Sequence, residues 1–85
     1  MYYTYILYSD SFDKFYIGQT IDISNRLSRH NNGSESATKP YIPWKMLWFA
    51  NKSSRSEAIL LEKKLKNLGK VRLIQFINKY SPDKP

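Results

Sequence analysis

The sequence predicts an α+β fold, a small three-stranded antiparallel sheet flanked by helices in the order β-β-α-β-α-α. Three observations predict it: an aromatic and β-branched run near the N-terminus, a change to helical spacing after Gly18, and a helix-capping signal at Ser54. The 85 residues are enough for one domain and too few for two. We therefore expect a single domain over residues 1–80 and a short C-terminal tail at 81–85.

An N-terminal hairpin is the first expected element. Residues 2–8 are rich in aromatic and β-branched side chains, which is typical of a strand. A polar turn then leads to a short second strand at 15–18. If Tyr5 lies opposite Gly18, Tyr16 becomes its diagonal neighbour on the same sheet face, and the glycine leaves open space beside the Tyr5 ring.

Capping and stop signals place the later elements. Thr20 or Asp22 can cap a helix, and the Asn-Asn-Gly sequence at 31–33 ends it. Ser54 and Glu57 match a capping box that begins a second helix. These signals predict a helix over 22–31, a polar loop over 34–43, a largely buried strand over 44–51, and helices over about 54–68 and 70–80.

The charge distribution indicates a polyanionic partner. Fourteen Lys and Arg against seven Asp and Glu leave a net charge of +7. Residues 26–85 hold thirteen of the basic and four of the acidic residues, a balance of +9. Such a domain is typical of nucleic-acid binding, and an ordinary solvated basic face is the alternative.

The residue content excludes several other classes of protein. With no cysteine, the chain has no disulfide framework, thiolate zinc site or cysteine nucleophile. No apolar run approaches the ~20 residues of a membrane span, and the first residues lack a signal-peptide layout. We therefore expect a cytoplasmic protein with no membrane partner.

Three polar side chains fall where packing alone does not explain them. Glu62 lies inside the apolar arc of the second helix, His30 on the apolar stripe of the first, and Arg26 at the edge of that stripe. A carboxylate facing a core is costly unless it is paired or binds a cation. Glu62 is therefore either a rim residue held by a nearby Lys or Arg, or a metal ligand or acid–base group. With Tyr5 and Tyr16, these residues indicate a polar pocket where two helices meet the sheet.

The available ligands restrict the metal chemistry. One His and three Glu disfavour a multi-ligand zinc site or a two-metal site. A single Mg²⁺ or Mn²⁺ ion needs only one or two protein carboxylates, because it keeps most of its waters and also binds substrate phosphate. Glu62 is the candidate ligand.

Five sequence elements, in order and at matching spacing, carry a family resemblance: Tyr3-Thr4-Tyr5, Tyr16-Ile17-Gly18, Arg26, His30 and Ala58-x-x-x-Glu62. This pattern resembles the GIY-YIG endonuclease superfamily, most of all the small stand-alone members that are similar to the N-terminal nuclease domain of a DNA-repair excinuclease. The resemblance covers roughly residues 2–68. It implies metal-dependent cleavage of nucleic-acid phosphodiester bonds on a three-stranded antiparallel sheet flanked by helices.

The resemblance also implies a catalytic role for each matched residue. Tyr5 would help to activate water, and Tyr16 would orient water or phosphate. Arg26 would neutralise the scissile phosphate, His30 would handle a proton, and Glu62 would be the single acidic metal ligand. A tyrosine of ordinary pKa, near 10, is a poor base at pH 7, so Tyr5 and His30 both remain candidates for the general base. The expected substrate contacts are Gly18, Gln19, Lys45, Lys63 and Lys66.

The expected function is a Mg²⁺- or Mn²⁺-dependent endonuclease acting on DNA, selective for DNA structure in repair or recombination, with a protein partner supplying the targeting. The alternative is a nucleic-acid-binding module that keeps the nuclease fold without turnover. A basic docking surface for a protein or an acidic membrane is a third interpretation. The candidate phosphate contacts of the binding module are Lys63, Lys64, Lys66, Lys70 and Arg72.

Overall fold

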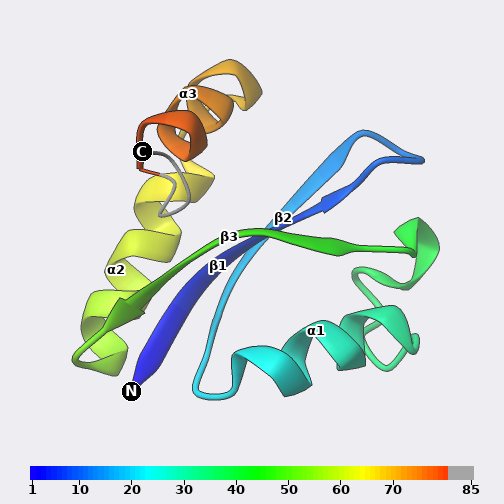
Figure 1. Ribbon diagram of the computed structural model, residues 1–85, viewed down its shortest axis with the longest axis horizontal. Helices are drawn as coiled ribbons and strands as arrows, with labels where there is room; N and C mark the ends of the chain where they lie inside the picture. The colour runs from blue at the N-terminus through cyan, green and yellow to red at the C-terminus, as the bar shows by residue number, and fades with distance from the viewer. Residues whose placement is uncertain (81–85) are drawn as a thin grey trace.

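The computed structural model describes residues 1–80, so the expected tail at 81–85 lies outside the described residues. Figure 1 shows a sheet with helices on both sides. The element order is the predicted β-β-α-β-α-α, with one additional short 3₁₀ turn in the loop before the third strand. The elements are β1 (Tyr2–Ser9), β2 (Lys14–Thr20), α1 (Ile23–Asn31), η1 (Lys39–Tyr41), β3 (Lys45–Lys52), α2 (Arg55–Lys66) and α3 (Lys70–Tyr80).

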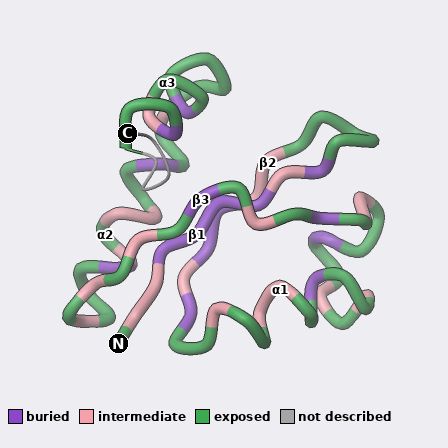
Figure 2. Tube along the Cα trace, viewed as in Figure 1, coloured by how far each residue is buried: buried purple, intermediate pink, exposed green. Residues whose placement is uncertain are grey.

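The three strands form one antiparallel sheet in the order β2-β1-β3. Tyr5 pairs with Gly18 of β2, which is the register considered for the hairpin, and with Phe49 of β3. Helices pack against both faces of the sheet at β1, and residues 4–7 are all buried (Figure 2). The predicted strand at 44–51 is less buried than expected, because β3 is an edge strand and leaves Leu47 and Phe49 exposed.

The alternation of side chains along β1 divides the core between the two sheet faces. Ile6 packs with Leu65 of α2 and Leu73 of α3 on one face. Tyr5 and Leu7 belong to a second cluster that includes Ile23 and Leu27 of α1 together with Trp44. Helix α1 therefore covers one face of the sheet, and α2 and α3 cover the other (Figure 1).

Side-chain caps fix where α1 and α2 begin. The Asp22 carboxylate accepts a hydrogen bond from the Asn25 N–H at 3.1 Å, and the Ser54 hydroxyl accepts one from the Glu57 N–H at 3.2 Å. Each cap satisfies a backbone donor that the first turn of a helix leaves unpaired. The cap at Asp22 places Arg26 and His30 one and two turns into α1.

Candidate active site

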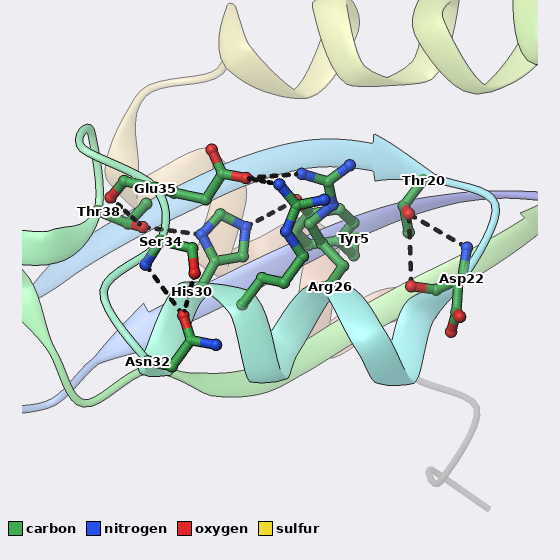
Figure 3. A network of polar contacts seen from close by, with 10 residues as sticks. Tyr5, Thr20, Asp22, Arg26, His30, Asn32, Ser34, Glu35 and Thr38 are labelled. Carbon is green, nitrogen blue, oxygen red and sulfur yellow. Dashed lines mark hydrogen bonds and ion pairs between the residues drawn. The ribbon is translucent and has the colours of Figure 1, made fainter.

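A chain of three buried polar side chains lies between α1 and the sheet (Figure 3). The Tyr5 hydroxyl lies 2.9 Å from His30 Nε2, and His30 Nδ1 lies 2.8 Å from Thr38 Oγ1. Tyr5 is 2% exposed and His30 1% exposed. Buried polar groups are costly unless they are hydrogen-bonded, and here both imidazole nitrogens have a partner.

One arrangement of protons satisfies every member of this chain. Thr38 Oγ1 also lies 3.4 Å from the Glu35 carbonyl, which can only accept, so the Thr38 hydroxyl donates to that carbonyl. Thr38 then accepts from the His30 Nδ1–H, and His30 Nε2 accepts from the Tyr5 O–H. Sequence patterns did not identify Thr38, because its part in the site depends on a contact across a loop.

Burial fixes the protonation state of the Tyr5–His30 pair. Desolvation raises the pKa of Tyr5 well above its ordinary value of 10, and the neighbouring Tyr16 raises it further. Desolvation lowers the pKa of His30, an effect that the Glu35 charge opposes and the Arg26 and Arg29 charges reinforce. At neutral pH the pair is therefore a phenol and a neutral imidazole.

The lowered pKa of His30 predicts a loss of stability in mild acid. The unfolded chain binds a proton at His30 near pH 6.5, whereas the folded protein resists it, so the unfolded state carries more protons below that pH. Thermal unfolding midpoints should fall from about pH 7 to about pH 5 in the wild type and fall less in His30→Gln. Equal slopes in the two proteins would contradict this assignment.

Gly18 lets the Tyr5 hydroxyl approach the backbone of β2. A Cβ at this position would lie 2.6 Å from Tyr5 Oη, 2.8 Å from Tyr5 Cζ and 3.2 Å from Tyr16 Cε2. The prediction of open space beside Gly18 is therefore wrong, because the phenol of Tyr5 itself fills that space. The glycine is required for the close approach, because any side chain there would displace the ring.

Tyr16 forms the less buried side of this cluster. Its ring centroid lies 4.9 Å from that of His30 and 6.4 Å from that of Tyr5, and it also packs against Trp44. Tyr16 is half-buried, whereas Tyr5 and His30 are fully buried. Of these three aromatic groups, Tyr16 is the one most open to a substrate.

Arg26 lies above the buried pair and carries an acidic partner that sequence patterns did not identify. Its Nη1 atom lies 3.1 Å from Glu35 Oε1. Arg26 and His30 are four residues apart in α1, so they lie on one face of this helix, and the Arg26 charge partly opposes the rise in the pKa of Tyr5 that burial causes. One feature of the sequence could have identified Glu35: it is the only acidic residue between positions 23 and 56.

The loop that carries Glu35 and Thr38 is tied closed at its far end. The Asn31 side chain donates to the Trp44 carbonyl at 2.9 Å and accepts from the Trp44 N–H at 2.6 Å. The Trp44 indole N–H donates to the Thr38 carbonyl at 2.9 Å. These uncharged hydrogen bonds join the loop to α1 in addition to the Arg26–Glu35 ion pair.

Glu62 lies on α2 and is paired within its own helix. Its carboxylate lies 2.7 Å from Lys66 Nζ, and the side chain is only 19% exposed. Within residues 1–80 it makes no hydrogen bond to Tyr5 or His30, although its charge raises the pKa of Tyr5. The pairing with Lys66 corresponds to the rim interpretation left open by the helical wheel, and α2 covers the sheet face opposite the one that Tyr5 and α1 share.

The remaining predicted substrate contacts are spread along the surface. Gln19 is half-buried next to Gly18, and Lys63 is exposed on α2. Lys45 instead pairs with Asp10 at 3.0 Å and lies over the Tyr8 ring, at the hairpin end of the sheet. The structure therefore groups Tyr5, Tyr16, Gly18, His30 and Arg26, and does not bring Lys45 into that group.

A basic-rimmed pocket of about 400 Å³ lies where β2 faces α2 and α3. Lys14, Lys66 and Lys70 line it together with Asp13, and Phe15 and Leu68 are among its apolar walls. Tyr16 also lines it. Two of these lysines are ion-paired, Lys66 with Glu62 and Lys70 with Asp13.

The acidic side chains of the described residues are compatible with a single hard metal ion. Within residues 1–80 no three His, Asp or Glu side chains cluster in a way that could hold a metal by themselves. A lone carboxylate such as Glu62 suffices only for an ion that keeps most of its waters and shares a substrate phosphate, which is the chemistry of Mg²⁺ and Mn²⁺. Zinc, which takes several protein ligands, does not fit.

The helices of the described chain include none that is long and apolar enough to cross a membrane. Comparison with known proteins identifies a structural relative, the solution NMR structure of a UPF0213 protein from Bacillus halodurans. It has a TM-score of 0.62 and 25% sequence identity, and the match covers 98% of this chain and 89% of that chain. No curated protein sequence matches. The sequence model of the GIY-YIG catalytic domain matches residues 1–80, so the chain belongs to the GIY-YIG nuclease family.

Proposed function

We propose that this protein is a divalent-metal-dependent endonuclease that hydrolyses phosphodiester bonds in DNA. The observation that carries the proposal is the buried Tyr5–His30–Thr38 chain, which begins at the β2 backbone beside Gly18 and lies under Arg26. Hydrolysis needs a proton acceptor for the attacking water and positive charge against the developing negative charge on phosphate. The chain supplies the first and Arg26 the second.

The proposed proton path uses both candidates for the general base. Substrate binding would have to bring the attacking water to the buried Tyr5 hydroxyl. That water would then transfer a proton to Tyr5 Oη while the Tyr5 proton passes to His30 Nε2, 2.9 Å away. The P–O bond to the leaving oxygen breaks as the new P–O bond forms, and the leaving oxygen takes up a proton from bulk water. Thr38 keeps accepting from His30 Nδ1–H, so the imidazolium that results stays oriented.

The other site residues act on the phosphate. Tyr16 orients the water or phosphate at the less buried side of the cluster, and Arg26 neutralises the phosphate oxygens. Glu62, with a substrate phosphate, would hold Mg²⁺ or Mn²⁺, which when bound polarises a phosphate oxygen and lowers the pKa of its water. Lys66 would leave Glu62 and pair with the substrate backbone, beside Lys63 and Gln19.

The proposed substrate is branched or flapped DNA in repair or recombination. The charges near the cluster contact phosphate, which carries no sequence information, so selectivity would depend on DNA shape or on a protein partner. The cytoplasmic location expected from the sequence stays a prediction.

A non-catalytic nucleic-acid-binding module is the second candidate. The Glu62–Lys66 ion pair favours it, since it leaves the only proposed metal ligand neutralised. The exposed side chains of Lys63, Lys64, Lys70 and Arg72 would then be the main phosphate contacts. Binding by such a surface falls steeply with salt.

The proposed function predicts metal-dependent cleavage. Wild-type protein should cleave flapped or branched DNA in Mg²⁺ or Mn²⁺, cleave plain duplex more slowly, and lose activity in EDTA. The measurement is product formation on labelled substrates resolved by gel. Cleavage that persists in EDTA would contradict the proposal, and salt-sensitive binding without any cleavage would support the binding module instead.

A further inference from the structure

Two arginines of α1 converge on one carboxylate oxygen. Glu35 Oε1 lies 3.1 Å from Arg26 Nη1 and 3.2 Å from Arg29 Nη2. The arginines are three residues apart, so their side chains lie on neighbouring positions of one helix face. All three side chains are open to water, with exposures of 29% for Arg26, 49% for Arg29 and 30% for Glu35. Figure 3 shows the Glu35 carboxylate beside the Tyr5–His30 pair.

Two guanidinium groups directed at one anionic oxygen form the arrangement that proteins use for phosphate. We propose that Arg26 and Arg29 together form a phosphate-binding fork, and that Glu35 occupies the fork in the free protein as an internal competitor. Identification of the incoming phosphate as part of a nucleic acid rests on the proposed function. Arg29 is thereby assigned as a second substrate ligand.

An ion pair that only holds the loop in place is the simpler explanation, and the loop does not need it. The Asn31–Trp44 bonds, the Trp44–Thr38 bond and the His30–Thr38 bond already tie this segment to α1. Arg29 is exposed, and an ion pair with an exposed arginine contributes little to stability. We therefore assign anion binding to this pair of arginines.

The competitor can leave without opening the loop. The Glu35 carbonyl accepts from the backbone N–H groups of Thr38 and Lys39, at 3.2 and 2.9 Å, which fixes the backbone of this residue. Only the side chain of Glu35 must rotate for phosphate to replace it. Thr38 and His30 therefore keep their hydrogen bond when the fork changes occupant.

The test is a titration with inorganic phosphate, followed by NMR of the arginine Nε–H signals. Glu35→Gln should bind phosphate about five-fold more tightly than wild type, with shifts at both Arg26 and Arg29, because the competing charge is gone. Asp10→Asn is the matched control: it removes one negative charge from an exposed ion pair at the hairpin end. Adding Arg29→Lys to Glu35→Gln should remove most of the gain.

Three outcomes would overturn the proposal: equal gains in Glu35→Gln and Asp10→Asn, phosphate shifts at Arg26 without Arg29, or no shift at either arginine. Binding of a short DNA in EDTA adds a second readout, in which the slope of log affinity against log salt should steepen by about one phosphate contact in Glu35→Gln. Neither readout needs cleavage. A protein that binds phosphate at both arginines but cleaves no DNA would keep this inference and lose the nuclease proposal.

Discussion

Glu62→Gln is expected to reduce cleavage about 1,000-fold while leaving folding nearly unchanged. The carboxylate is the single proposed metal ligand, so the amide removes the charge that holds the ion. The pair with Lys66 is an i,i+4 contact on a helix, and losing it should cost less than about 1 kcal/mol. Single-turnover cleavage at saturating Mg²⁺, together with thermal unfolding, measures the two effects.

Asp10→Asn again serves as the matched control, because it makes the same change of charge in another lysine pair. It should cleave at the wild-type rate. If Glu62→Gln cleaves as fast as this control, Glu62 holds no catalytic metal, and its role is reduced to the ion pair with Lys66.

Gly18→Ala is expected to lower the free energy of unfolding by about 1–3 kcal/mol and to slow cleavage about 100-fold. The new Cβ would lie 2.6 Å from Tyr5 Oη, and the fully buried ring has no free space into which it can shift without disturbing its neighbours. Displacing the hydroxyl also breaks its hydrogen bond with His30. Urea denaturation measures the stability, and the cleavage assay measures the activity.

A double-mutant cycle with Tyr5→Phe identifies the cause of that loss. Removing the Tyr5 hydroxyl relieves the closest contact, so Gly18→Ala should cost less in the Tyr5→Phe background than in wild type. Gly69→Ala is the control, because a Cβ there would meet nothing within 4 Å. Additive effects of Gly18→Ala and Tyr5→Phe would show that Gly18 acts elsewhere than on the Tyr5 hydroxyl.

The elements and their order could be predicted because their signals are local. The caps at Asp22 and Ser54 begin α1 and α2, and the structure has the hairpin register that was considered, with Tyr5 opposite Gly18. The burial of β3 could not be predicted in the same way. An apolar run such as 44–51 does not reveal whether its strand is central or at an edge, since that depends on sheet order.

The sequence by itself determined the fold class, the basic character and the set of polar side chains on apolar faces, because helix and strand periodicity are properties of neighbouring residues. Only the tertiary structure decided which groups meet. In the folded chain Thr38 is hydrogen-bonded to His30, and Glu35 forms ion pairs with two arginines. The Tyr5 phenol fills the space beside Gly18. Each of these contacts joins segments separated along the chain, and their closeness depends on packing and loop closure, which no local pattern records.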